Sequence, residues 1–294
     1  MSTPLGSRVP PIISGAGTLL SRYDVLFCDV WGVVHDGIRA YGPATDALLR
    51  FREGGGTVVL LTNAPVPVAR VEAMLEARHV PAETYDAIVS SGEIALAHMQ
   101  EQGYRAVHFI GPRERDAAFF TAAKAEDAPL ETAEAVVCTG LTDDVNETVD
   151  SYRNLLERAH ARALPFVCAN PDLVVDVGGR LFLCAGALAD AYAHLGGTVF
   201  WAGKPHATAY ASATAKAARI RGQDIPAERI LVIGDAVRTD LTGAERAGLD
   251  ALFVAGGIHR HETMDDGQII PAKLAALFPP GTPTALGAMG ELHW

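Results

Sequence analysis

The chain has 294 residues, 49% of them apolar and 20% charged, so we expect a large buried core rather than a disordered chain. Its 24 basic and 35 acidic residues give a formal net charge of −11, which excludes a uniformly basic nucleic-acid surface and argues against a polybasic membrane patch. An anionic substrate fits this charge only where a local cation offsets it.

The sequence contains no run of ~18 apolar residues, so no transmembrane helix is expected. Residues 1–8 lack the charged-then-apolar layout of a secretory signal. The expected lack of a membrane helix and of a secretory signal favours a cytoplasmic protein. The cysteines favour it too, because their positions are typical of buried, reduced thiols. The four cysteines lie in or beside apolar runs and form no CxxC pair: Cys28, Cys138, Cys168 and Cys184.

Predicted strands and helices alternate at both ends of the chain. This alternation predicts a doubly wound α/β fold, a parallel sheet with helices on both faces, whose ligands bind beyond the carboxyl ends of the strands. The predicted core strands are Val25–Asp29, Thr57–Leu61, Asp86–Val89, Thr198–Trp201, Arg229–Ile233 and Asp250–Val254. The predicted helices are Pro43–Glu53, Pro65–His79, Ser91–Gln102, His206–Ile220 and Thr239–Ala247.

The middle of the chain repeats this theme. Strands are predicted at Arg105–Ile110, Ala135–Thr139 and Pro165–Ala169, and a long helix at Asn146–Ala163. We therefore expect a core formed by residues 1–102 and 198–294, with an α/β cap of residues 103–197 inserted between them.

Chemically capable side chains follow four of the predicted core strands. Each of them alone also fits a helix cap, a turn or a surface charge. An acidic pair at a strand end can reach a metal ion, a hydroxyl and nearby amides can hold an oxyanion, and a lysine can neutralise a phosphate. In chain order these features are Asp29, Thr62-Asn63, Lys204 within Gly203-Lys204-Pro205, and the pair Asp235 and Asp240.

In this order the features resemble the haloacid dehalogenase (HAD) superfamily of aspartate-nucleophile hydrolases. Further segments resemble its class IIA, which has a C2-type cap and includes 4-nitrophenylphosphatases and sugar-phosphate phosphatases. The resemblance implies a Rossmann-like core with an inserted cap. The segments that carry it are Ala169-Asn170-Pro171-Asp172, Leu183-Cys184-Ala185-Gly186-Ala187-Leu188 and Ala202-Gly203-Lys204-Pro205.

The resemblance also implies residue roles and a phosphatase activity. Asp29 would attack phosphorus and form an aspartyl phosphate, while Thr62, Asn63 and neighbouring amides would bind the phosphoryl oxygens. Lys204 would hold the nucleophile and the phosphoryl group together against charge repulsion. The implied Mg²⁺ ligands are Asp29, the backbone carbonyl of Trp31, Asp235 and, in support, Asp240.

Two cap residues, Asn170 and Asp172, would face the substrate by the same resemblance, although the Asn-Pro-Asp string also fits a plain turn. His259 and His261 follow the last strong strand, and without a third partner at ligand spacing they fit a solvated loop. The expected partner is a small phosphorylated metabolite, with no nucleic acid and no membrane. A homodimer through the cap is expected by analogy.

Trp31 departs from the family pattern, because phosphatases of this family carry a second aspartate there as general acid and base. An indole cannot relay protons, and the lost assistance is typically ~10²–10⁴-fold in rate. Three interpretations stay open. Another group, such as His35 or Asp36, substitutes; the substrate has a good leaving group; or the protein is not a phosphatase. The last includes a HAD hydrolase of another bond and a catalytically weak protein that binds a phosphometabolite for regulation.

Overall fold

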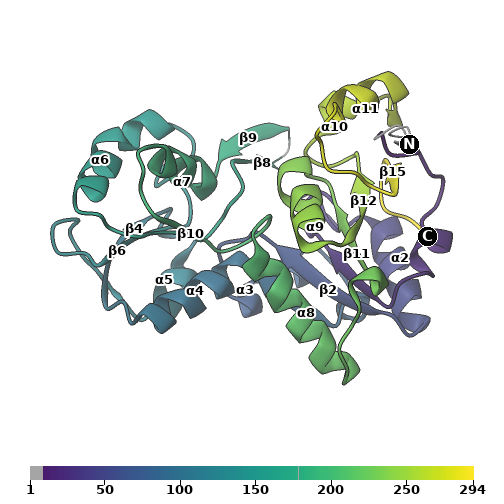
Figure 1. Cartoon of the computed structure of the whole chain (residues 1–294), viewed down its shortest axis with the longest axis horizontal. Coiled ribbons are helices and arrows are strands. Elements are labelled where there is room, and N and C mark those ends of the chain that lie inside the picture. Colours follow the sequence, from purple (N-terminus) through teal and green to yellow (C-terminus); the bar gives the residue numbers. More distant parts are fainter. Residues whose placement is uncertain (1–8, 178) are drawn as a thin grey trace, which may run out of the picture. The chain divides into compact units, whose positions relative to one another are not determined.

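The computed structural model describes residues 9–177 and 179–294 of the chain (Figure 1). Its contacts divide the chain into two compact units. The first unit consists of Met1–Leu61, Met74–Ile88 and Tyr210–Trp294, and the second of Thr62–Ala73 and Val89–Ala209. The expected cap, residues 103–197, falls within the second unit, and its boundaries stay a prediction.

A six-stranded sheet forms the centre of the first unit, in the order β15-β12-β11-β1-β2-β3. Its pairs β1–β2, β1–β11, β11–β12 and β12–β15 are parallel. Strands β1, β2 and β11 are buried along their whole length, which explains why they read as continuous apolar runs. The strands are β1 (Val25–Cys28), β2 (Thr57–Thr62), β3 (Ala87–Ser90), β11 (Ile230–Gly234), β12 (Asp250–Val254) and β15 (Gly287–Met289).

Helices and short turns connect these strands. Two of the helices, Gly42–Glu53 and Pro271–Leu277, have a proline in the first turn, where its missing amide hydrogen costs no helical hydrogen bond. The helices are α1 (Gly17–Leu20), α2 (Gly42–Glu53), α3 (Val68–Glu76), α8 (Ala207–Arg221), α9 (Thr242–Ala247), α10 (Arg260–Thr263) and α11 (Pro271–Leu277). Short turns are η1 (Ala82–Thr84), η3 (Ala227–Arg229) and the π-helical η4 (Val237–Leu241), and β13 (Met264–Asp265) pairs antiparallel with β14 (Gln268–Ile269).

The second unit has a five-stranded parallel sheet in the order β10-β7-β6-β4-β5. Alternate residues of β6 pack into two different apolar clusters. Val136 and Cys138 belong to one cluster, and Ala135 and Val137 belong to the other. Because successive side chains of a strand point to opposite faces, both faces of the sheet are covered. Figure 1 shows α6 and α7 on one side of this sheet and α4 and α5 on the other. The strands are β4 (Ala106–Ile110), β5 (Glu126–Asp127), β6 (Ala135–Cys138), β7 (Phe166–Cys168) and β10 (Val199–Trp201).

In the described part of the chain, the remaining elements of this unit are four helices, a 3-10 turn and a hairpin. Helix α4 begins with a side-chain cap, in which Ser90 accepts a hydrogen bond from the Glu93 amide, and ends at Gly103 with φ +71°. The elements are α4 (Ser91–Gln102), α5 (Ala117–Ala122), η2 (Val149–Tyr152), α6 (Arg153–Ala161), α7 (Ala185–His194) and the antiparallel strands β8 (Val174–Val177) and β9 (Arg180–Leu183).

The predicted α/β class with parallel sheets is confirmed, but two details of the prediction are wrong. The strand predicted at Thr198–Trp201 was assigned to the core sheet, whereas β10 pairs with β7 in the sheet of the second unit. The long helix predicted at Asn146–Ala163 is shorter, because Thr148 forms a capping box with Ser151 and starts the helical segment only there.

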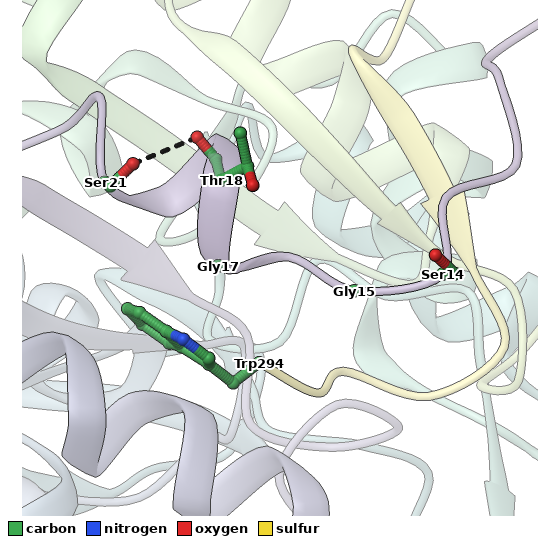
Figure 2. Close-up of a pocket in the computed structure, with 6 residues that line it drawn as sticks. All are labelled: Ser14, Gly15, Gly17, Thr18, Ser21 and Trp294. Carbon is green, nitrogen blue, oxygen red and sulfur yellow. Dashed lines mark hydrogen bonds between the residues drawn. The ribbon is translucent and has the colours of Figure 1, made fainter.

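The C-terminal residues pack on the N-terminal segment of the first unit (Figure 2). The Ala16 amide donates a hydrogen bond to the His293 carbonyl at 2.9 Å, and a ring nitrogen of His293 lies 2.8 Å from the Ser14 carbonyl oxygen. A Cβ atom at Gly17 would lie 2.7 Å from the indole nitrogen of Trp294, so only glycine accommodates the indole there. These contacts tie the two ends of the described chain together.

No helix in residues 9–177 and 179–294 is long and apolar enough to cross a bilayer. All four cysteines are buried and none forms a disulfide, as the sequence predicts.

Candidate active site

Three aspartates of the first unit gather at the carboxyl end of its sheet. Asp29 follows β1 and Asp235 follows β11, and the two strands are neighbours whose register pairs Cys28 with Ile233. Asp240 lies in η4, the turn that begins two residues after Asp235. One oxygen atom from each carboxylate lies within 4.8 Å of the others, and the exposed fractions of the residues are 9%, 4% and 1% in chain order.

Three glycines leave the space that this cluster of carboxylates occupies. A Cβ atom at Gly32 would lie 2.0 Å from an oxygen of Asp235, and one at Gly257 would lie 1.9 Å from the same oxygen. A Cβ atom at Gly234 would lie 2.1 Å from the carboxyl carbon of Asp240. The local backbone therefore shapes a cradle that only glycine permits.

Backbone amides orient two of the three carboxylates. The Ile258 amide donates a hydrogen bond to Oδ2 of Asp235 at 2.7 Å, and the Ala236 amide donates one to Oδ2 of Asp240 at 3.1 Å. The contribution of the loop after β12 was not predicted from the sequence. The available signal was the Gly256-Gly257 pair, which lies one residue beyond a predicted strand and indicates a turn but not which residue the turn contacts.

The donor set fits a hard divalent cation. Three buried carboxylates repel one another, so a shared positive ion is the simplest way to keep them ionised. Mg²⁺ binds through one or two carboxylates and retains several waters, which suits oxygen atoms converging from three positions. Asp29, Asp235 and Asp240 are the residues that would hold it.

A second group of predicted residues comes together in the second unit. Nδ2 of Asn63 donates hydrogen bonds to Oδ1 of Asp172 at 2.9 Å and to the carbonyl of Lys204 at 3.1 Å. Oδ1 of Asn63 accepts a hydrogen bond from the Lys204 amide at 2.9 Å. Both donor hydrogens of the amide are thus used, and Asn63 and Lys204 are 4% and 2% exposed. Asn63 is a positioning residue for the turn that carries Lys204.

The turn around Lys204 is tightly enclosed. A Cβ atom at Gly203 would lie 2.3 Å from Oδ1 of Asn63 and 2.8 Å from the hydroxyl of Ser91. That hydroxyl donates a hydrogen bond to the Ala202 carbonyl at 2.7 Å. The lysine backbone is therefore fixed from both sides within its own unit.

The other predicted site residues make local contacts. Oγ1 of Thr62, at the end of β2, accepts a hydrogen bond from the Ala64 amide at 3.2 Å. Oδ1 of Asn170 accepts one from the Asp172 amide at 3.1 Å, an Asx turn. The structure thus brings together one group in each unit, Asp29 with its two acidic neighbours and Asn63 with Lys204. The convergence of Thr62 and Lys204 on the three carboxylates stays a prediction.

Comparisons with known proteins identify the family of the chain. Residues 26–125 match the family of haloacid dehalogenase-like hydrolases, and residues 201–277 match a HAD-hydrolase-like family. A crystal structure of a hydrolase of the haloacid dehalogenase-like family from Brucella suis is 41% identical with a TM-score of 0.82, and the alignment covers 96% of this chain and 99% of that one. The chain belongs to the haloacid dehalogenase-like hydrolases.

More distant members of the HAD superfamily share the fold. A possible sugar phosphatase from Cytophaga hutchinsonii is 19% identical with a TM-score of 0.73, covering 96% of this chain and 98% of that one. A glycerol phosphate phosphatase from Mycobacterium tuberculosis, solved in complex with magnesium, is 25% identical with a TM-score of 0.61, covering 81% of this chain and 70% of that one. No curated protein matches the chain significantly.

Trp31 is the residue that departs from the expected family pattern, and its ring is held within the loop that follows Asp29. A Cβ atom at Gly37, where φ is +89°, would lie 2.5 Å from the indole. The His35 ring meets the indole edge-on, with ring centroids 5.2 Å apart. Residues 31, 35 and 40 are joined by isolated β-bridges, so the loop is a compact turn.

His35 and Asp36, the predicted substitutes for the missing acid, serve this turn. The Gly37 amide donates a hydrogen bond to Nδ1 of His35 at 3.0 Å. Burial, helped by Arg78, lowers the pKa of His35 from 6.5 to about 4, so the ring is neutral at pH 7. Oδ1 of Asp36 accepts hydrogen bonds from the amides of Ile38 and Arg39, both at 2.8 Å.

His259 lies closer to the acidic cluster than its sequence pattern indicates. Its Nε2 accepts a hydrogen bond from the Val237 amide at 3.4 Å, at the start of η4, and its Nδ1 lies 3.1 Å from Oε1 of Glu262. The prediction of a solvated loop is therefore wrong for His259, which ties the loop after β12 to the turn that carries Asp240.

Proposed function

We propose that this HAD hydrolase is a Mg²⁺-dependent phosphomonoester hydrolase that acts through an aspartyl phosphate on Asp29. The observation that supports this most strongly is the cluster of Asp29, Asp235 and Asp240, three buried carboxylates with oxygen atoms within 4.8 Å of one another. A carboxylate of such a cluster can both ligate a cation and attack an electrophilic phosphorus.

The reaction has two displacements. In the first, a carboxylate oxygen of Asp29 bonds to phosphorus and the bond from phosphorus to the leaving-group oxygen breaks. In the second, water attacks the phosphorus, which releases inorganic phosphate and regenerates Asp29. When bound, Mg²⁺ offsets the negative charge on the transferring phosphoryl group, with Asp235, Asp240 and the Trp31 carbonyl as further ligands.

Other residues of the chain would hold the substrate. Thr62 and the amides after β2 offer donors for the phosphoryl oxygens, and Lys204 offers a positive charge whose backbone Asn63 fixes. Asn170 and Asp172 are proposed to contact the substrate. A homodimer through that unit stays a prediction.

The proposed substrate is a small phosphorylated metabolite. The glycerol phosphate phosphatase and the possible sugar phosphatase among the structural relatives support the small size and the phosphate group of this substrate, but not a particular leaving group. A net charge of −11 is compatible with an anionic substrate if a bound divalent cation and Lys204 offset the charge locally, as this proposal requires.

The substitution Asp29→Asn tests this function with 4-nitrophenyl phosphate and Mg²⁺. The amide cannot attack phosphorus, so we expect turnover to fall to background while the unfolding temperature changes little. The matched control is Asp46→Asn, which removes an exposed carboxylate of α2 that forms an ion pair with Arg50 and should retain full activity. Turnover in Asp29→Asn at the unmodified rate would refute the nucleophile assignment.

A further inference from the structure

The loop after the proposed nucleophile lacks an evident proton donor. When an aliphatic alcohol leaves a phosphate ester, its oxygen needs a proton, and a positioned acid contributes typically ~10²–10⁴-fold to the rate. When a phenol, an enol or a carboxylic acid leaves, the anion is stable and needs no such help. The side chains around Asp29 therefore carry information about the class of substrate.

Trp31 cannot serve as this acid, because an indole N–H donates a hydrogen bond but does not ionise near neutral pH. Its ring is also fixed. Gly37 leaves space for the indole that a Cβ atom would fill at 2.5 Å, and His35 packs edge-on against it. The turn is thus built around an apolar ring rather than around a carboxyl group.

The neighbouring polar side chains of the turn are used for structure. His35 is 2% exposed, and its Nδ1 accepts the hydrogen bond from the Gly37 amide. Asp36 accepts two amide hydrogen bonds through one oxygen, which is the geometry of an ionised turn aspartate. Neither is arranged to deliver a proton to a leaving group.

Two further groups lie near the acidic cluster in the first unit. Both ring nitrogens of His259 face partners, Val237 and Glu262. Tyr41, at the end of the turn, is partly buried, and its amide donates a hydrogen bond to the Val34 carbonyl at 2.8 Å; the variant described below tests its hydroxyl as an acid.

We propose that the substrates of the phosphatase are phosphates whose leaving group is stable as an anion, namely aryl, enol or acyl phosphates. This inference rests on the proposed function. A carboxylate oxygen of Asp29 bonds to phosphorus, and the electron pair of the breaking bond departs with the leaving-group oxygen as a phenolate, enolate or carboxylate. No proton comes from the loop after β1, and water then hydrolyses the aspartyl phosphate and releases a proton to solvent.

The test compares kcat/KM for three phosphate esters with Mg²⁺ present: 4-nitrophenyl, phenyl and ethyl phosphate. This ratio reports the step in which the leaving group departs. In the unmodified protein we expect kcat/KM to fall along this series by more than ~10²-fold, the scale of a missing general acid.

Two substitutions at Trp31 make the test specific. Trp31→Asp introduces a carboxyl group and should raise kcat/KM for ethyl phosphate ~10²–10⁴-fold relative to that for 4-nitrophenyl phosphate. The matched control Trp31→Phe also removes the indole but adds no acid, and should keep the steep dependence on the leaving group. Circular dichroism and thermal unfolding establish that each variant is folded. If Trp31→Asp does not fold, the series measured on the unmodified protein decides.

The outcomes separate this inference from the proposed function. Equal kcat/KM for ethyl and 4-nitrophenyl phosphate in the unmodified protein would overturn the inference and leave the phosphatase intact. A Tyr41→Phe variant that loses ethyl phosphate hydrolysis selectively would overturn it as well, because the tyrosine would then be the acid. No turnover of any of the three esters would instead reject the phosphatase, and the inference with it.

Discussion

At the scale of single residues, Asn63 shows how a side chain expected to touch substrate is occupied by its neighbours. It was predicted to bind phosphoryl oxygens because it follows Thr62 at a strand end, yet its amide joins Asp172 to the backbone of Lys204. The position of Asn63 at the end of a strand could be predicted from the sequence. The partners were not, because they lie more than a hundred residues away and depend on how the second unit folds.

Truncating Asn63 is expected to impair the lysine turn. In Asn63→Ala the buried Lys204 amide loses its acceptor, which costs ~1–3 kcal/mol. Where this cost raises the activation barrier by displacing Lys204, kcat should fall ~10-fold or more, because ~1.4 kcal/mol corresponds to a tenfold change in rate. Steady-state kinetics on 4-nitrophenyl phosphate measure this. The control Asn146→Ala removes one exposed side-chain hydrogen bond, to Asp143, and should leave kcat unchanged. An unchanged kcat in Asn63→Ala would contradict the positioning role.

His35 predicts a dependence of stability on pH. Its pKa is 6.5 when exposed and about 4 in the folded protein, so between these values the unfolded chain binds a proton that the folded protein does not. Stability contributed by the neutral ring is therefore complete above pH 6.5 and is lost as the pH falls towards 4. The difference corresponds to about 3 kcal/mol. Urea unfolding from pH 7.5 to 5 should show a steeper loss in the unmodified protein than in His35→Gln.

At the scale of elements, the strand ends were largely predictable and the loops between them were not. The strand Asp250–Val254 and the helix Ser91–Gln102 occur with the predicted bounds, because apolar runs and caps mark them. The strand β10 was assigned to the wrong sheet, since three apolar residues look alike in either sheet. The hairpin β8–β9 was missed altogether.

The glycines around the acidic cluster predict how a substitution in the loop after β12 affects activation by Mg²⁺. In Gly257→Ala the new methyl group would overlap Oδ2 of Asp235, so the carboxylate or the loop after β12 must move. We expect the Mg²⁺ concentration for half-maximal activity to rise ~10-fold or more, the scale of second-shell changes at metal sites. The control Gly42→Ala, where nothing lies within 4 Å of the added Cβ, should leave Mg²⁺ activation unchanged. Equal Mg²⁺ dependence in both variants would count against the metal assignment of Asp235.

At the scale of the whole molecule, the sequence signalled a two-part α/β hydrolase but not the contacts that close the first unit. The run from Phe278 to Trp294 carried no readable pattern, yet it contributes β15 to the sheet edge and holds residues 11–16 through backbone hydrogen bonds. Such contacts join segments almost the full chain apart, so local patterns cannot reveal them.

Trp294 therefore has a measurable role in stability. Its indole covers Gly17 and is 39% exposed, so Trp294→Ala should lower the free energy of unfolding by ~1–2 kcal/mol, in proportion to the partly buried area (Figure 2). Chemical denaturation measures the change. An Ile38→Ala control removes an exposed side chain and should alter stability by less than ~0.5 kcal/mol. Equal effects of the two substitutions would show that the terminal indole adds nothing.

The buried cysteines allow local unfolding of each unit to be measured separately. Cys28 lies in the first unit, while Cys138 and Cys168 sit side by side on β6 and β7 of the second. Burial raises the pKa of Cys138 to about 12, so the thiol reacts with an alkylating reagent only when its surroundings unfold. Mass spectrometry of alkylated peptides over time would therefore give a separate opening rate for each unit, without introducing any label or substitution.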